Sequence, residues 1–194
     1  MSSRGGVEDR GATGAPVALE RLRALLRNEG GLIATLVGED DLDCGPTGDR
    51  AVSPASVAAR GPRAQGRREE YELLVEAIYE GYLLHYGSPR VVLTPEADLR
   101  VLAGDRLYAI GLARLVDIGD TVAVAELADT ITLSALAQGA GDEPLAEAVW
   151  AAGARAVGWG PSEEHSRAKG LVAAGSGEAI EAMRTSMLVM PSTP

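Results

Sequence analysis

The stretch "VLAGDRLYAIGLARLVDIGDTVAVAELADTITLSALAQG", residues 101–139, decides the fold class. It consists of two long segments rich in Leu, Ala, Val and Ile, separated by Gly119 and Asp120. Glycine is typical of helix ends and aspartate of helix N-caps, so the pattern predicts one helix ending near Ile118 and another beginning after Asp120. Gly104 has no side chain and would allow a neighbouring helix to approach the first segment closely.

Charged side chains are spread around the first of these helices instead of lying on one side. Over residues 99–118 they are Arg100, Asp105, Arg106, Arg114 and Asp117. Leucine, isoleucine and valine fill the remaining directions, which predicts a helix in the middle of a bundle. Because an unpaired buried charge is costly, we expect Asp105 and Arg106 to have partners.

Helical patterns continue on both sides of this stretch. Further helices are predicted over residues 67–87, 142–159, 163–175 and 177–189, with Asp142 and Ser162 as N-caps. No segment alternates as a strand would, except for the three residues "VVL" at 91–93. We therefore predict an all-α fold, with a helical bundle domain over residues 67–190.

The first third of the chain has a different composition. Pro16 and the leucines after it predict an N-terminal helix within residues 16–37. Residues 1–15 lack apolar periodicity and are expected to form a disordered arm. Residues 38–66 are rich in Gly, Pro, Ser and Asp, and we expect a mobile loop or linker there.

Composition and charge exclude several classes of protein. Residues 71–160 carry 13 acidic and five basic side chains, which would repel a phosphate backbone, so nucleic-acid binding is not expected. Cys44 is the only cysteine, which fits a reducing compartment. No apolar run reaches membrane-spanning length and no secretory leader pattern is present. We expect a cytoplasmic protein without a membrane span.

Residues that carry chemistry are sparse. "GEDDLDCG", residues 38–45, has four acidic residues in five positions, which is typical of a solvated loop and lacks the spacing of a calcium loop. His85 and His165 each lack a second ligand at helical spacing, and no serine has a nucleophile-elbow context. The residues themselves predict no catalytic site, no metal and no cofactor.

Residues 70–140 resemble the helices that surround and follow the first aspartate-rich motif of trans-type polyprenyl diphosphate synthases. The similarity rests on a short motif and on residues that follow it at unbroken spacing, namely Leu102, Ala103, Gly104 and Asp105, then Gly119 and Asp120, then Leu127 and Ala128. The resemblance implies a truncated isoprenoid synthase fold, in which Gly104 and Asp105 are a structural signature and not metal ligands.

The residues that catalyse the reaction in this family have no counterpart here. The family holds magnesium ions on two aspartate-rich motifs, since a hard cation prefers several carboxylate oxygens. The place of the first motif contains no aspartate pair but Glu76, Tyr79, Glu80, Tyr82 and His85. No second motif follows Gln138. The resemblance therefore implies a chain that is inactive alone, with magnesium entering only through an active partner.

Two functions of different classes follow. The first is a non-catalytic or regulatory subunit in isoprenoid biosynthesis, forming a homo- or hetero-oligomer, the partner being a full-length polyprenyl diphosphate synthase. The alternative is a stand-alone helical domain that binds a protein or an apolar ligand and has no isoprenoid role. Tyr79, Tyr82 and Tyr86, close together on one predicted helix, are the candidate interface residues, because tyrosine is favoured at interfaces.

Overall fold

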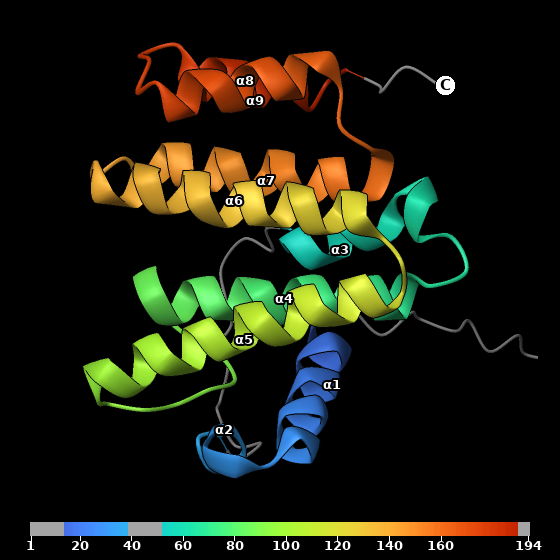
Figure 1. Cartoon of the computed structure of the whole chain (residues 1–194), viewed down its shortest axis with the longest axis vertical. Coiled ribbons are helices and arrows are strands. Elements are labelled where there is room, and N and C mark those ends of the chain that lie inside the picture. The colour runs from blue at the N-terminus through green and yellow to red at the C-terminus, as the bar shows by residue number, and fades with distance from the viewer. Residues whose placement is uncertain (1–13, 39–51, 190–194) are drawn as a thin grey trace, which may run out of the picture.

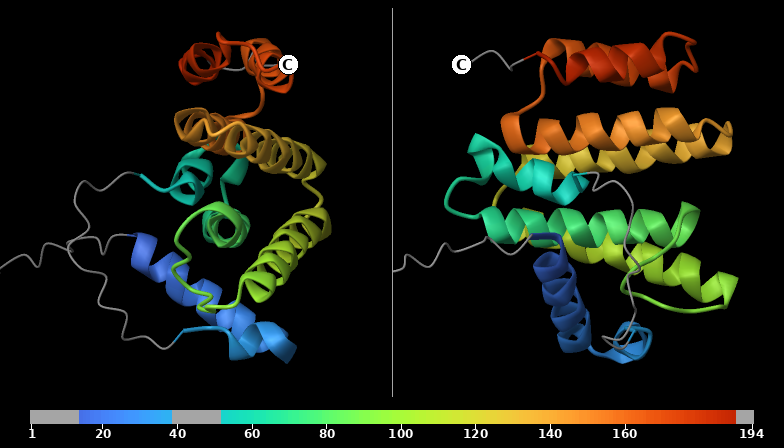
Figure 2. Two further views of the ribbon diagram at one scale, coloured as in Figure 1. Left: turned by 90° about the vertical axis from the view of Figure 1, so that its left-hand side faces the viewer. Right: turned by 180° about the vertical axis from the view of Figure 1, so that it is seen from behind.

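The helices stack in layers, most of them formed by two consecutive helices (Figures 1 and 2). The computed structural model describes residues 14–38 and 52–189, and within these ranges the chain is helical apart from turns, loops and one isolated bridge between Val37 and Val92. The all-α prediction is confirmed.

Each layer can be followed in Figure 1 from bottom to top. The first contains α1 (Gly14–Glu29) and the short α2 (Gly31–Thr35), followed by α4 (Arg68–Tyr86) with α5 (Ala97–Asp117), α6 (Thr121–Gly139) with α7 (Glu143–Trp159), and α8 (Glu163–Ala173) with α9 (Ala179–Ser186). Between α4 and α7 lie α3 (Pro54–Arg60) and a 3-10 helix (Pro62–Ala64). The chain thus climbs through the stack in sequence order, with α3 inserted at its centre.

The predicted N-caps of three helices are confirmed. The side chain of Asp120 accepts a hydrogen bond from the N–H of Ala123 at 2.9 Å, and Asp142 and Ser162 accept from the backbone three residues later at 3.0 and 3.1 Å. Such bonds satisfy N–H groups that have no partner inside the helix. They set where α6, α7 and α8 begin.

Glycines allow α4 and α5 to pack closely, as the sequence predicted for Gly104. A Cβ atom at position 104 would lie 2.5 Å from Nε2 of His85 and 3.1 Å from the carbonyl oxygen of Gly81 on α4. Two turns further along α5, a Cβ atom at Gly111 would lie within 3 Å of the Ile78 side chain. The absence of side chains at these positions brings the two helices into contact.

The prediction that residues 99–118 form the central helix is wrong. On α5, Val101, Leu102 and Val116 are exposed, whereas α4 and α7 contribute the largest sets of buried residues. The reason is that α5 packs on α4 and only partly on other helices, so its scattered charges are directed to the surface. Charges distributed around a whole helix therefore do not show whether the helix is buried or lies at the surface with its charges in ion pairs.

Two boundaries near the N-terminus also differ from the sequence prediction. The helix expected within residues 16–37 is interrupted at Gly30 and Gly31, whose φ angles of 69° and 62° are outside the helical region. The segment 38–66, which was expected to be a loop, contains α3 and the 3-10 helix. The loop prediction is therefore wrong for residues 54–64. Ala55, Ala58 and Ala64 are completely buried, since small side chains let this segment enter the space between α4 and α7.

Some of the sequence predictions fall on segments that are not described. Residues 39–51 of the expected loop, with Cys44 and the acidic run, lie outside the described residues, as do residues 1–13 of the expected arm. Gly14 and Ala15, the last residues assigned to the arm, belong to α1.

Candidate functional site

The part of the sequence that the resemblance aligned with an aspartate-rich motif lies on α4, and its two glutamates are buried. The side chains of Glu76 and Glu80 are only 1% and 0% exposed. Nη2 of Arg90 lies 2.5 Å from Oε1 of Glu76, and Nε of Arg90 lies 3.2 Å from Oε2 of Glu80. The guanidinium group also lies 5.2 Å from the centre of the Tyr79 ring. One arginine thus neutralises charge from both glutamates.

Glu80 fixes the backbone that follows α4. Its Oε1 atom accepts hydrogen bonds from the N–H groups of Arg90, Val91 and Val92, at 2.6, 2.6 and 3.3 Å. Burial raises the pKa of Glu76, while the charge and hydrogen bond of Arg90 act in the opposite direction. With these partners, both carboxylates stabilise the loop and neither is presented to solvent for a metal-bound substrate.

The three tyrosines proposed as interface residues form part of an aromatic cluster with Trp150. Tyr82 is 7% exposed, lies 5.2 Å from Trp150 between ring centres, and its hydroxyl accepts a hydrogen bond from Gln138 at 2.7 Å. Tyr79 is partly buried and meets Trp150 edge-on at 4.9 Å. Tyr82 as an interface residue is wrong, because α6 and α7 cover this side of α4. Tyr86, at the end of α4, is exposed.

The residues that carried the family resemblance have separate structural roles. Asp105 does have a partner, with Oδ1 3.3 Å from Nε2 of His85, but its side chain is 65% exposed. Arg106 pairs with Glu29 at 3.0 Å. Ala103 is buried against α1 and α2, and Leu102 is exposed beside it. The structure therefore places these residues on α5 without bringing them together with Asp120.

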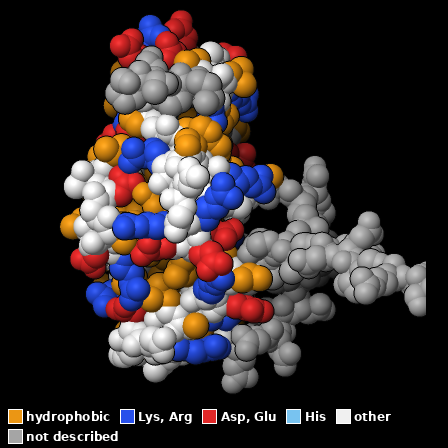
Figure 3. All heavy atoms as spheres, turned by 90° about the vertical axis from the view of Figure 1, so that its right-hand side faces the viewer, with side chains coloured by type: hydrophobic (Ala, Val, Ile, Leu, Met, Phe, Trp, Pro, Cys, Tyr) orange, Lys and Arg blue, Asp and Glu red, His pale blue; other side chains and the backbone are white. Residues whose placement is uncertain are grey.

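From the turn between α5 and α6, the Asp120 side chain bonds to three segments, namely α4, the 3-10 helix and α6. Beyond capping α6, it accepts hydrogen bonds from the hydroxyl of Tyr71 and, at 2.6 Å, from Nη2 of Arg63. Nε of Arg63 also donates to the carbonyl of Val157 on α7. Burial raises the pKa of Asp120, but the Tyr71 and Ala123 hydrogen bonds and the Arg63 charge outweigh burial and hold it below its ordinary value. Figure 3 faces this side of the molecule and shows acidic and basic side chains interleaved over it.

Sequence reasoning missed a second buried ionic cluster, between α6 and α8. Glu126 is 5% exposed, its Oε2 atom lies 3.1 Å from Nε2 of His165, and its Oε1 atom lies 3.0 Å from Nζ of Lys169. Lys169 also pairs with Asp129 at 2.7 Å. The spacing of four between His165 and Lys169 places both on one face of α8, and this is the signal that could have identified the cluster.

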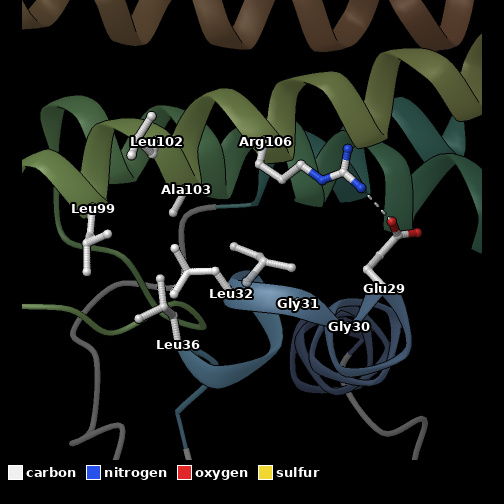
Figure 4. A pocket seen from close by; sticks show the side chains of 10 residues that line it. Glu29, Gly30, Gly31, Leu32, Leu36, Leu99, Leu102, Ala103 and Arg106 are labelled. Carbon is white, nitrogen blue, oxygen red and sulfur yellow. Dashed lines mark hydrogen bonds and ion pairs between the residues drawn. The ribbon is translucent and has the colours of Figure 1, made fainter.

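A pocket of about 300 Å³ lies between α2 and α5 (Figure 4). Its walls are aliphatic, provided by Leu32, Ile33 and Leu36 from the α2 segment and by Leu99, Leu102 and Ala103 from α5. Figure 4 shows the ion pair between Glu29 and Arg106 at one end. The pocket exists because Gly30 and Gly31 turn the chain after α1, so that α2 runs past α5.

Exposed apolar and small residues recur on α5 and on α6, the two helices that the turn at Asp120 joins. We define the α5–α6 face by its residues, which are Ala109, Ala113, Val116, Val122, Ala125 and Leu136. Val116 and Leu136 are 55% and 51% exposed. Apolar side chains that are exposed together are typical of sites of protein association.

The described part of the chain contains neither a metal-binding cluster nor a membrane-spanning helix. No group of three or more His, Cys, Asp or Glu side chains in residues 14–38 and 52–189 is arranged to hold a metal ion. Over the same ranges, none of the helices combines the length and the apolar character that crossing a membrane requires. Comparisons with models of protein families, with curated proteins and with solved structures find no match.

Proposed function

We propose that this chain is a non-catalytic helical subunit that acts by binding a partner protein in the cytoplasm. The α5–α6 face is the observation that carries the proposal, because both helices expose valine, leucine or alanine where a helix surface in contact with water is usually polar. From the resemblance of residues 70–140, the proposed partner is a full-length polyprenyl diphosphate synthase.

The acidic side chains of α4 support a non-catalytic role. Ionisation of an allylic diphosphate requires magnesium held by carboxylates that face the substrate. Glu76 and Glu80 are buried, and their oxygens are engaged by Arg90 and by backbone N–H groups. Releasing them for a metal would break both ion pairs of Arg90 and expose two buried carboxylates, and breaking pairs that involve buried charges is costly.

The proposal is tested by mixing the purified chain with a full-length synthase from the same organism. We expect the two to co-elute in size-exclusion chromatography, and we expect the activity or the product chain length of the synthase to change. Val116→Asp and Leu136→Asp should abolish both effects, because each places a charge within the α5–α6 face. Leu188→Asp is the matched control, since Leu188 is 83% exposed and lies beyond α9.

Two results would contradict the proposal. One is co-elution and altered product length that persist unchanged in Val116→Asp and Leu136→Asp. The other is steady condensation of isopentenyl diphosphate with an allylic diphosphate by this chain alone, abolished by a chelator. The first would reject the α5–α6 face, and the second would reject the non-catalytic role.

A further inference from the structure

We infer that the pocket between α2 and α5 binds a single aliphatic chain that carries one anionic head group, the head group contacting Arg106. The inference concerns a small ligand and does not depend on the partner proposed for the α5–α6 face. It rests on the lining of the pocket, on its size and on the charges at its end.

The lining favours an aliphatic ligand. Leu32, Leu36 and Leu99 extend into the space between the two helices in Figure 4. Among the residues that the structure describes, Glu29 and Arg106 contribute the polar side chains of the wall. Leu32 and Leu102 are 56% and 59% exposed, so the apolar surface is accessible from solvent. A mainly apolar pocket with a few polar groups at one place is the usual form of a small-molecule site, in which the polar groups orient the ligand.

The volume limits the length of the chain. A pocket of about 300 Å³ holds about ten groups of the size of a water molecule or a methylene, if each takes roughly 30 Å³. A chain of about ten carbons would therefore fill it. Since each buried methylene contributes about 0.8 kcal/mol, affinity should rise about fourfold for each carbon added until the pocket is full.

The charges at the end of the pocket favour an anionic head group. Glu29 pairs with two arginines, through Oε2 with Arg106 at 3.0 Å and through Oε1 with Arg114 at 2.8 Å. The three side chains together carry one positive charge in excess. The Arg106 side chain is 54% exposed. A carboxylate or phosphate can thus bind the guanidinium of Arg106 while Glu29 keeps Arg114 as its partner.

The test uses the full chain and decanoate as the probe, with binding measured by calorimetry and by methyl NMR. We expect decanoate to bind more tightly than hexanoate, decanol or decyltrimethylammonium, and to shift the methyl signals of Leu32, Leu36 and Leu99 but not those of Leu188. Arg106→Gln should weaken decanoate binding tenfold or more, the effect of losing a charge-assisted hydrogen bond, and leave decanol binding unchanged.

Two control variants, one outside the pocket and one within it, test whether the effect of Arg106→Gln is specific to the head group. Arg167→Gln removes another exposed arginine, on α8, and should leave decanoate binding unchanged. Leu99→Asn, within the pocket, should weaken decanoate and decanol equally, while an unchanged helical circular dichroism spectrum shows that the variant is folded. Failure of decanoate to bind, equal weakening of decanoate binding by Arg106→Gln and Arg167→Gln, or tighter binding of decyltrimethylammonium than of decanoate would each overturn the inference.

Discussion

Nζ of Lys169 lies 3.0 and 3.1 Å from the two carboxylate oxygens of Glu126, so the only lysine in the sequence is paired with a carboxylate in the protein interior. Glu126 belongs to α6 and Lys169 to α8. His165, one turn before Lys169, contacts the same carboxylate. This cluster fastens the last layer of the stack to the layer below it, and it makes that attachment dependent on pH.

Glu126→Gln should therefore destabilise the protein near neutral pH but not in acid. Burial raises the pKa of Glu126, yet His165 and Lys169 outweigh burial and hold it below its ordinary value of 4.5. A carboxyl group whose pKa is lowered on folding stabilises the protein above its unfolded pKa, and this contribution is lost as the pH falls through the folded pKa. We expect a loss of about 3 kcal/mol at neutral pH.

Urea unfolding at a series of pH values from about 7 down to about 2, below the lowered pKa of Glu126, measures this prediction. The difference in the free energy of unfolding between the parent protein and Glu126→Gln should shrink as the pH falls below 4.5. Glu164→Gln, at an exposed ion pair with Arg167, is the control and should change stability by less than about 1 kcal/mol. A difference for Glu126→Gln that stays constant with pH would contradict the role assigned to its charge.

Tyr71 should titrate late and stabilise the turn at Asp120. Burial, followed by the hydrogen bond to Asp120, raises the pKa of Tyr71 to about 12. A raised pKa means that the contribution to stability is complete below the ordinary pKa of 10.0 and is lost as the pH rises through about 12. Tyr71→Phe should lower the free energy of unfolding by about 1–2 kcal/mol at neutral pH.

Ultraviolet titration of the phenolate checks the assignment. Just above pH 10, the parent protein should contain one protonated tyrosine that is absent from the Tyr71→Phe variant. Tyr86→Phe, at an exposed position, serves as the control and should leave stability nearly unchanged. If Tyr71→Phe and Tyr86→Phe unfold at the same urea concentration, the hydrogen bond from Tyr71 to Asp120 contributes nothing to the stability of the fold.

Gly158→Ala should be strongly destabilising, although alanine is the better helix former. A Cβ atom at position 158 would lie 2.5 Å from the carbonyl oxygen of Ala58, a backbone atom of α3 that cannot move independently of its helix. Overpacking of this kind costs about 1–3 kcal/mol. Gly170→Ala, on α8 with open space around it, should instead stabilise by up to about 1 kcal/mol. Thermal unfolding of the two variants should give shifts of opposite sign.

Glu80→Gln should weaken the attachment of residues 90–92 to α4. The substitution removes the negative charge that faces Arg90 and three backbone N–H groups in a site with no exposure to solvent. Arg90 keeps Glu76 as a partner, but the three N–H groups lose a charged acceptor, and hydrogen bonds to charged groups contribute about 1.5–3 kcal/mol. Hydrogen exchange of the Val91 and Val92 amides should accelerate in this variant. Glu69→Gln, whose partner is Arg21 at the surface, should leave their exchange unchanged.

Local patterns in the sequence determined the fold class and several helix ends. Asp120, Asp142 and Ser162 cap their helices as predicted, because a capping side chain bonds to an N–H group only three residues away. Gly104 marked the close approach of a second helix because the lack of a side chain is a local property. Interactions of this short range are specified within one segment of chain, whatever packs around it.

The tertiary structure alone decided which residues meet across segments. Arg90 neutralises Glu76 and Glu80, Lys169 meets Glu126 from 43 residues away, and α3 fills the centre of a stack from a segment that resembles a loop in composition. It also decided that α5 is an outer helix and that α2 and α5 enclose a pocket. These features depend on how helices with similar apolar faces are paired and ordered, and the spacing of residues along one helix does not specify the helix that will cover it.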